Sequence, residues 1–141
     1  MSHYAESPFL ELVDTELEEW RENFVRIRLR LKPHHLNRAG VVHGGVLATL
    51  LDHAGGFSGA YCTVPGNRRY GMTLSLTCNF VSQSKTGSLI ATGQVERSGN
   101  KIFFARTKVE TEDGVLVATG SSVHRYRSGS EKPEGVPARD S

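Results

Sequence analysis

The residue best suited to catalysis in this chain is Asp52. It lies within the stretch V-H-G-G-V-L-A-T-L-L-D-H-A-G-G at residues 42–56. An ionised carboxylate in an apolar run is costly unless it is paired or faces a cavity. Its neighbours in the run give it no obvious ion pair at helical spacing. Asp52 therefore either accepts hydrogen bonds from a buried loop or serves as a catalytic base or nucleophile.

Two glycines, Gly44 and Gly45, open the same stretch. The first backbone N–H groups of a helix have no partner within the helix, and the helix dipole favours negative charge there. Because neither glycine has a side chain, a ligand oxygen can reach these N–H groups directly. The pair predicts an oxyanion hole. The alternative is that His43, Gly44 and Gly45 form only a tight turn into the helix.

Asp52 and the glycine pair are too far apart to act together within one chain. His43 and Asp52 are nine residues apart, which is ~13 Å along a helix and about half a turn around it. Two such helices packed antiparallel across a two-fold axis would bring Gly44 of one subunit to Asp52 of the other. The spacing predicts a homodimer with two composite sites, either alone or as a dimer of dimers.

The element that carries these residues is expected to be one long buried helix. Apolar residues cover most of its circumference from Gly44 to about Cys62, which gives a length of ~19 residues or ~28 Å. Gly55, Gly56 and Gly59 weaken the second half by about 1 kcal/mol each relative to alanine. The simplest reason for them is the close approach of another backbone.

Alternating apolar and polar residues predict strands on both sides of this helix. One strand precedes it at residues 25–31, and four follow it at 71–80, 88–97, 102–111 and 115–126. Tight turns between the later strands favour antiparallel neighbours. A short helix at residues 7–14 has Ser7 as its N-cap and Pro8 in its first position. Together these elements predict an α+β fold in which a curved antiparallel sheet wraps around the long helix and leaves an edge for dimerisation.

The composition is that of a soluble globular protein. The chain has 141 residues, of which 38% are hydrophobic and 23% charged, and its net charge of +2 is too small to indicate nucleic acid. We interpret the arginines at 25–31 and 125–127 as solvated strand faces. We expect a single domain at residues 1–127 and a disordered tail at 128–141, which is rich in Gly, Ser, Pro and charge.

Other features of the sequence predict a cytoplasmic protein without a cofactor. No apolar run is long enough to span a membrane, and the N-terminus lacks a signal sequence. The two cysteines are expected to be free thiols in a reducing compartment. The six histidines show no metal-ligand spacing, so neither a metal nor another cofactor is expected.

The stretch N-R-A-G-V-V-H-G-G-V-L-A-T-L-L-D-H-A resembles the helix motif of hotdog-fold acyl-CoA thioesterases, in particular the phenylacetate-degradation (PaaI-like) group. The family pattern is an Asn, a His six positions later, Gly-Gly, and an Asp nine positions after the His. Asn37, His43, Gly44, Gly45 and Asp52 fit it. The later strands also resemble the family, and the likeness extends over about residues 10–126.

The resemblance implies a role for each matching residue. The Gly44 N–H would polarise a thioester carbonyl, and Asp52 of the partner subunit would activate water or attack the carbonyl itself. Asn37 and His43 would orient the substrate and the loop. The family often has Ser or Thr at the position of Thr73, near the attacking water. Hydrolysis of a medium-chain or aryl acyl-CoA needs no metal, because a carboxylate, a water molecule and an oxyanion hole suffice.

The CoA phosphates are expected to meet basic residues at strand ends. Lys85, Arg97 and Lys101 occupy such positions, and with Gly45 they are the candidate substrate-binding residues. The alternative is that all three cations are solvated turn charges. The acyl tunnel is expected to be lined by the sheet and by apolar residues of the long helix, namely Leu50, Leu51, Ala54 and Phe57.

Two other functions stay open. The first is a hotdog acyl-thioester hydratase or dehydratase, in which His43 and Asp52 would act across the dimer. The second is a non-catalytic acyl-CoA-binding module. Release of free CoA thiol separates hydrolysis from both.

Overall fold

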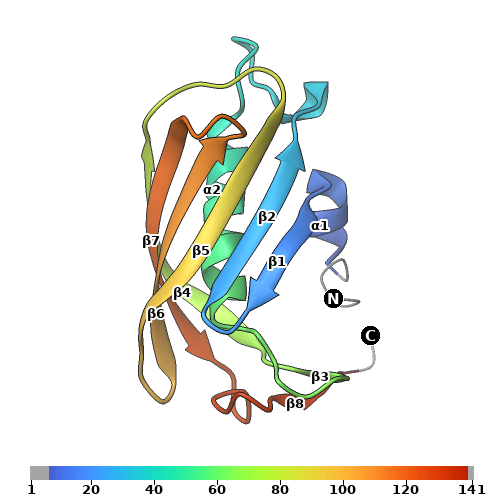
Figure 1. Ribbon diagram of the computed structural model, residues 1–141, viewed down its shortest axis with the longest axis vertical. Helices are drawn as coiled ribbons and strands as arrows, with labels where there is room; N and C mark the ends of the chain where they lie inside the picture. The colour runs from blue at the N-terminus through green and yellow to red at the C-terminus, as the bar shows by residue number, and fades with distance from the viewer. Residues whose placement is uncertain (1–6, 140–141) are drawn as a thin grey trace.

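The computed structural model describes residues 7–139. Six antiparallel strands form one sheet in the order β1-β2-β5-β6-β7-β4, which curves around the helix α2 (Figure 1). In chain order the elements are α1 (Pro8–Val13), β1 (Glu16–Arg21), β2 (Phe24–Arg30), the 3₁₀ helix η2 (Pro33–His35), α2 (Gly44–Ser58), β3 (Asn67–Arg68), β4 (Gly71–Phe80), β5 (Ser88–Ser98), β6 (Ile102–Thr111), β7 (Leu116–Tyr126) and β8 (Val136–Pro137). The predicted α+β hotdog arrangement is confirmed.

The core lies between α2 and the inner face of the sheet. Leu47, Leu50, Leu51 and Ala54 of α2 are buried there against alternate residues of the strands. Each fully buried aliphatic side chain of this kind contributes about 1.5–3 kcal/mol relative to an exposed one. The core strand residues are Val25, Ile27, Leu29, Leu89, Ala91, Val109, Val117 and Ala118. The alternation predicted for the first strand is confirmed.

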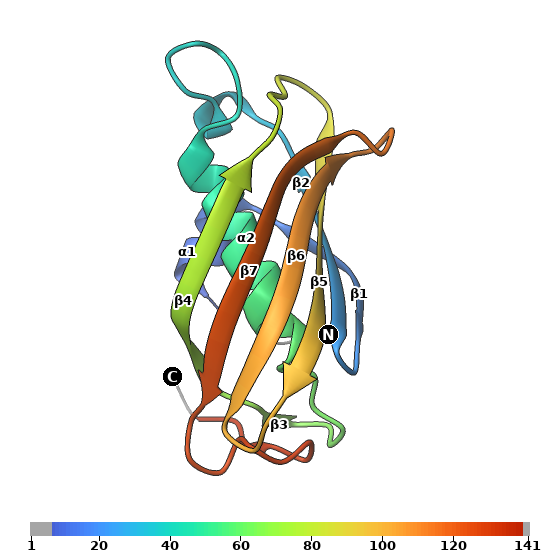
Figure 2. The same cartoon turned by 90° about the vertical axis from the view of Figure 1, so that its left-hand side faces the viewer.

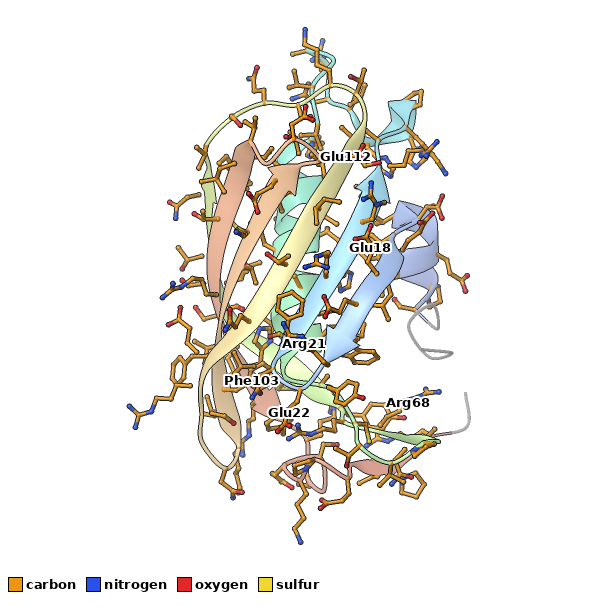
Figure 3. The ribbon with its side chains drawn as sticks, in the orientation of Figure 1. Glu18, Arg21, Glu22, Arg68, Phe103 and Glu112 are labelled. Carbon is orange, nitrogen blue, oxygen red and sulfur yellow. The ribbon has the colours of Figure 1, made fainter. Side chains whose placement is uncertain are left out.

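The outer face of β2 carries arginines that are paired rather than merely solvated. Arg28 forms ion pairs with Glu18 of β1 and with Glu112, the latter at 3.0 Å; both glutamates are labelled in Figure 3. Arg26 pairs with Glu19 at 3.0 Å. Two of these pairs link β2 to β1, and the third links β2 to the turn after β6. Each contributes at most about 1 kcal/mol at the surface.

The strand β1 is absent from the sequence-based prediction. A bulge between Leu17 and Glu19 shifts its register against β2. The bulge breaks the two-residue alternation that reveals a strand in the sequence. β1 and β2 form a hairpin whose turn contains Asn23 with a positive φ of 64°.

The helix α2 is shorter than predicted. It contains 15 residues, Gly44–Ser58, and side chains from the sheet bind carbonyl groups at its end. Trp20 Nε1 donates a hydrogen bond of 2.7 Å to the Phe57 carbonyl, and the Tyr126 hydroxyl donates one of 2.6 Å to the Gly59 carbonyl. Carbonyls at a helix end lack partners within the helix, so these bonds stabilise its end.

Gly55 in α2 makes room for side chains, which corrects the prediction of a close backbone. A methyl group at Gly55 would overlap Ser122 Oγ and lie 2.9 Å from His124 Nε2. Close backbone approach occurs instead at Gly93 of β5, where a methyl group would overlap the Ala54 carbonyl. α2 therefore lies directly against β5 and against two polar side chains of β7.

The segment 128–139, for which the sequence predicts a disordered tail, contacts the chain before β4. β8 pairs with β3, and the Ser130 Oγ, in a residue that is 1% exposed, accepts a hydrogen bond of 2.9 Å from the Tyr70 N–H. Arg69 donates hydrogen bonds to the carbonyls of Ser130 and Glu131 at 3.0 and 2.9 Å. The segment has few apolar residues, and these bonds hold it against the chain before β4. Residues 140 and 141 lie outside the described residues.

β4 forms one edge of the sheet, with no strand beyond it in the described chain (Figure 2). Alternation alone predicts that Met72 and Leu74 share the inner face with Leu76. A bulge between Thr73 and Ser75 shifts the register instead. It leaves Met72 and Leu74 44% and 51% exposed.

None of the helices in residues 7–139 has the length and the apolar character that a membrane span requires.

His35 anchors the loop that leads into α2. It is 2% exposed, its Nε2–H donates to the Val13 carbonyl (2.8 Å), and its Nδ1 accepts from the Lys32 N–H (3.0 Å). The His35 carbonyl accepts a hydrogen bond of 2.8 Å from the His43 N–H. Because Nδ1 has to be an acceptor, the neutral imidazole fits the site, and burial lowers the pKa of His35.

The free energy of unfolding is expected to fall as the pH is lowered from about 7.5 to about 5.5. The folded-state pKa of His35 lies below the ordinary value of 6.5, so the unfolded chain binds more protons in this window. The stabilisation is complete above the ordinary pKa and is lost as the pH falls toward the folded-state pKa. Each such histidine contributes a slope of at most about 1.4 kcal/mol per pH unit. Urea unfolding at a series of pH values measures this slope.

His34 supplies the matched control for this measurement because it is exposed beside His35. His34→Gln should retain the slope, whereas His35→Gln should lose stability at about pH 7.5 and show a smaller slope. Burial also lowers the pKa values of His53 and His124, which account for the slope that remains. Equal slopes in the two variants would contradict the role given to His35.

Candidate active site

Asp52 lies half-buried on α2 at the side facing β4. Thr73 Oγ1 donates a hydrogen bond of 2.7 Å to Asp52 Oδ1. Within residues 7–139 Asp52 has no salt bridge and its Oδ2 has no hydrogen-bond donor. A neutral hydroxyl thus satisfies one oxygen, and the negative charge has no cationic partner. This arrangement leaves Oδ2 available to act on a water molecule or a carbonyl carbon.

The hydrogen bond to Asp52 continues into the sheet through His124. The His124 Nδ1 lies 3.2 Å from Thr73 Oγ1, and its Nε2 lies 2.7 Å from Ser122 Oγ. The ring of Phe103 (labelled in Figure 3) stacks on the imidazole with centroids 4.8 Å apart and an angle of 17°. Burial lowers the pKa of His124, and the nearby charge of Asp52 opposes this effect.

His124 and Ser122 belong to the candidate site by their hydrogen bonds, and the sequence-based prediction missed them. Alternation along β7 places both on the same face, and the register opposes Thr73 to His124. The alternation is visible in the sequence, whereas the register is not. Thr73, which the resemblance placed near the attacking water, lies beside Asp52.

The start of α2 leaves one backbone donor free. His43 is the N-cap, and its Nδ1 accepts a hydrogen bond of 2.8 Å from the Gly45 N–H. Among the described residues the Gly44 N–H has no hydrogen-bond acceptor. The exposed ring of Phe80 lies nearby, 3.7 Å from the position of a methyl group at Gly44. Of the two predicted oxyanion donors, the Gly44 N–H is available to a ligand, whereas the Gly45 N–H already donates to His43.

Asn37 shapes the loop before the helix. Its Oδ1 accepts hydrogen bonds from the N–H groups of Ala39 (2.9 Å) and Val41 (3.3 Å). Its own N–H donates to the Val41 carbonyl (2.8 Å), and Gly40 has a φ of 78°. Asn37 therefore holds the loop that delivers His43 and Gly44 to the helix start, and it lies apart from Asp52.

An aromatic cavity of about 230 Å³ opens beside Asp52. Its wall combines the polar groups of Asp52, Thr73 and His124 with aromatic and basic side chains, among them Phe57, Arg69, Tyr70, Phe103 and Tyr126. Leu50, Leu51 and Ala54, which were expected to line an acyl tunnel, are fully buried in the core. Only Phe57 of the expected helix residues reaches the cavity.

The three predicted CoA-binding cations do not meet within one chain. Lys85 lies in the loop before β5, whereas Arg97 is near the end of β5 and Lys101 is in the turn that follows it. The 11-residue strand between them separates the two ends by ~35 Å. All three residues could therefore bind the same CoA molecule only if two subunits supply them.

A second cavity, of about 250 Å³, lies at the Lys101 end of the sheet and is lined by basic side chains. Lys101, Arg125 and Arg127 line it, together with Met72, Tyr126, Ser128 and Glu131. Met72 and Tyr126 also line the cavity beside Asp52, so the two cavities adjoin. Within the described chain none of the three cations forms a salt bridge.

In the part of the chain from residue 7 to residue 139, no group of three or more His, Cys, Asp or Glu side chains is arranged to hold a metal ion.

Comparison with known proteins gives a consistent picture. Residues 39–118 match the sequence model of the thioesterase superfamily. The medium/long-chain acyl-CoA thioesterase YigI of Salmonella typhimurium is 24% identical over 131 residues, covering 83% of this chain and 84% of its own. The Escherichia coli PaaI protein from the phenylacetic acid degradation operon has a TM-score of 0.80 at 19% identity, covering 92% of this chain and 91% of that one.

A hypothetical thioesterase from Streptococcus pneumoniae, solved with coenzyme A, has a TM-score of 0.71 at 22% identity, with 88% of both chains covered. The two structural similarities show the fold that this chain shares with those proteins.

Proposed function

Because the chain belongs to the thioesterase superfamily, we propose that it hydrolyses an acyl-CoA thioester to the free acid and CoA. The observation that carries the proposal is Asp52, a carboxylate without a cationic partner that is held by Thr73 at the mouth of an aromatic cavity. A similar protein is described as a medium/long-chain acyl-CoA thioesterase and another was solved with coenzyme A, which supports acyl-CoA as the substrate. The aromatic wall favours a medium-chain or aryl acyl group.

Asp52 supplies the reactive oxygen in this proposal. Oδ1 is engaged by Thr73, so Oδ2 either removes a proton from water or attacks the thioester carbonyl carbon itself. In both routes negative charge develops on the carbonyl oxygen, and a backbone N–H at a helix start stabilises that charge. The free Gly44 N–H is such a donor. When the tetrahedral intermediate collapses, the C–S bond breaks and CoA leaves as a thiolate that takes up a proton. If water attacked, the free acid is formed directly; if Asp52 attacked, an Asp52–acyl anhydride remains, and water hydrolyses it to the free acid and the Asp52 carboxylate.

The site is complete only in a dimer. Gly44 and Asp52 are eight residues apart on one helix, which corresponds to ~12 Å. β4 runs beside the helix, so that Thr73 lies next to Asp52 and Phe80 lies next to Gly44. If the free edges of two β4 strands pair antiparallel about an axis between Leu76 and Thr77, Gly44 of the partner subunit approaches Asp52.

The same pairing gives a reason for the exposed apolar residues at this edge. Phe80 and Val81 are 57% and 55% exposed in the single chain. In an antiparallel pair they would lie beside the first residues of the partner's β4, where Met72 and Leu74 are exposed. Apolar edges of this kind are normally covered in soluble proteins.

Release of CoA thiol from a panel of acyl-CoA thioesters tests the proposed activity. We expect the purified protein to release thiol stoichiometrically with free acid from at least one medium-chain or aryl acyl-CoA. Enoyl-CoA absorbance followed in parallel detects hydration or dehydration. Binding without thiol release across the panel would refute hydrolysis.

The CoA phosphates, in this proposal, bind at the cavity lined by Lys101, Arg125 and Arg127. These cations adjoin the Asp52 cavity and have no carboxylate salt bridge within the described chain, whereas Arg106 and Lys108 on the outer face pair with glutamates. In the antiparallel dimer, the loop carrying Lys85 of the partner subunit comes to the same end. In this dimer, Lys101 of one subunit and Lys85 of the partner subunit can bind the same CoA molecule.

The triple variant Lys101→Gln, Arg125→Gln, Arg127→Gln is expected to raise the KM for acyl-CoA about 10-fold or more, because each charge-assisted phosphate contact is lost. The kcat should change little. The KM for the N-acetylcysteamine thioester of the same acid, which lacks phosphates, should be unchanged. Steady-state kinetics with both substrates measures the difference.

The double variant Arg106→Gln, Lys108→Gln removes charge from the paired outer face and should leave both KM values unchanged. Separate Lys85→Gln and Arg97→Gln variants test the two remaining predicted cations. An unchanged KM for acyl-CoA in the triple variant would rule out this placement of the phosphates.

A further inference from the structure

We propose that His124 is a positioning residue for Asp52 that acts through Thr73. The proposal rests on the function proposed above and concerns the same site. His124 does not reach the carboxylate directly, because Thr73 Oγ1 lies between them, 2.7 Å from Asp52 Oδ1 and 3.2 Å from His124 Nδ1. What His124 controls is the direction in which the Thr73 hydroxyl points.

Asp52, Thr73, His124 and Ser122 are linked in series by hydrogen bonds, and the bond to Asp52 fixes the direction of the other two. An ionised carboxylate only accepts hydrogen bonds, so the single hydroxyl proton of Thr73 points to Asp52. Thr73 Oγ1 must then accept from His124, which requires a proton on Nδ1. Burial lowers the pKa of His124 and favours the neutral ring. Nε2 is then the acceptor for the Ser122 hydroxyl. The Ser122 hydroxyl, the His124 Nδ1–H and the Thr73 hydroxyl therefore each donate in the direction of Asp52.

The surroundings of His124 hold the ring in this orientation. His124 and Ser122 are 2% and 3% exposed, so water does not compete for their hydrogen bonds. Phe103 stacks on the ring at 4.8 Å between centroids. Gly55 of α2 leaves the space that the pair occupies, because a methyl group there would overlap Ser122 Oγ. The helix, β6 and β7 together fix the imidazole.

The consequence for catalysis is the position of the reactive oxygen. With Oδ1 held by Thr73, Oδ2 is the oxygen that meets water or the carbonyl carbon. A side chain held by one hydrogen bond from a fixed donor samples fewer orientations, and small errors of orientation are costly at a reacting atom. Thr73 alone can rotate about its χ1 angle, and the Nδ1–H of His124 selects the rotamer that serves Asp52.

A double-mutant cycle tests whether His124 acts through Thr73. His124→Phe retains the stacked ring and removes both nitrogens, whereas Thr73→Val removes the hydroxyl at nearly constant shape. Each is expected to lower kcat about 10-fold with little change in KM, because Thr73→Val removes the hydrogen bond to the charged Asp52 and His124→Phe leaves the Thr73 hydroxyl unoriented. The double variant should be no slower than about the slower single variant, because the two act as one unit. A product of the two losses, about 100-fold, would overturn the proposal.

Thr73→Ser is the matched control because it retains the hydroxyl. In that background His124→Phe should again cost about 10-fold. Ser122→Ala is a smaller change at the far end of the same group, and it should lower kcat by a few-fold without unfolding the protein. No loss in Ser122→Ala and in His124→Phe, with both folded, would show that Thr73 holds Asp52 unaided.

The tautomer of His124 gives a measurement that needs no substrate. ¹⁵N NMR of the histidine side chains should show a neutral ring protonated on Nδ1, and Ser122→Ala should increase the population protonated on Nε2. A wild-type ring protonated on Nε2 would overturn the positioning role whatever the activity. A ring protonated on Nδ1 in a protein that hydrolyses no thioester would refute the proposed function alone.

Discussion

Asp52→Asn is expected to lower the turnover of acyl-CoA by at least about 100-fold, the low end of an acid–base contribution. Asparagine has the same shape as aspartate, and its Oδ1 can still accept the hydrogen bond from Thr73. It cannot take a proton from water or attack a carbonyl as a carboxylate does. The fold and the KM should therefore change little. Thiol release under saturating substrate measures the loss.

Asp113→Asn provides the control, because Asp113 is exposed in the turn between β6 and β7. It removes the same charge far from the cavity and should leave the turnover unchanged. Thermal unfolding and size-exclusion chromatography of both variants check that neither the fold nor the assembly has changed. Turnover of Asp52→Asn within a few-fold of wild type would remove Asp52 from the mechanism.

Mixing two inactive variants is expected to restore about a quarter of wild-type activity, because the proposed site combines Asp52 of one subunit with Gly44 of the other. The first variant is Asp52→Asn. The second is Gly44→Leu, whose side chain covers the free N–H. The first side-chain carbon would lie 3.7 Å from the ring of Phe80, an ordinary contact.

The expected fraction follows from random pairing. About half of the dimers formed on co-refolding are mixed, and each mixed dimer holds one site with both changes and one with neither. Differently tagged variants allow the mixed dimers to be purified and assayed directly. If purified mixed dimers are inactive, each chain builds its site alone, and the antiparallel pairing of β4 is wrong. The same variants refolded separately give the baseline.

The parts of the site that could be predicted from the sequence are those set by local chemistry. Asp52 stands out because a carboxylate is unusual in an apolar helix, and Gly44 because helix starts have free N–H groups. Both depend only on residues within one helical segment. The fold class was also predictable, since the alternation in four of the strands is regular.

The parts that were missed depend on register and on long-range hydrogen bonds. The bulge beside Thr73 decides which residues of β4 face Asp52, and no pattern in the sequence reveals it. His124 joins the site through a strand pairing with Thr73, 51 residues away. The contacts of the segment 128–139 involve Arg69 and Tyr70, which the composition of the segment itself cannot reveal.

The pairing of β4 with β7 also has a consequence for how the protein folds. Thr73 and His124 meet only after the last long strand of the sheet has joined the edge. Contacts between segments so distant in sequence form slowly, because loop closure precedes the gain from pairing. α2 can form locally and much earlier. On refolding, the recovery of hydrolysis should thus lag behind the recovery of helical circular dichroism, and a nascent chain carries no working site until β7 has been made.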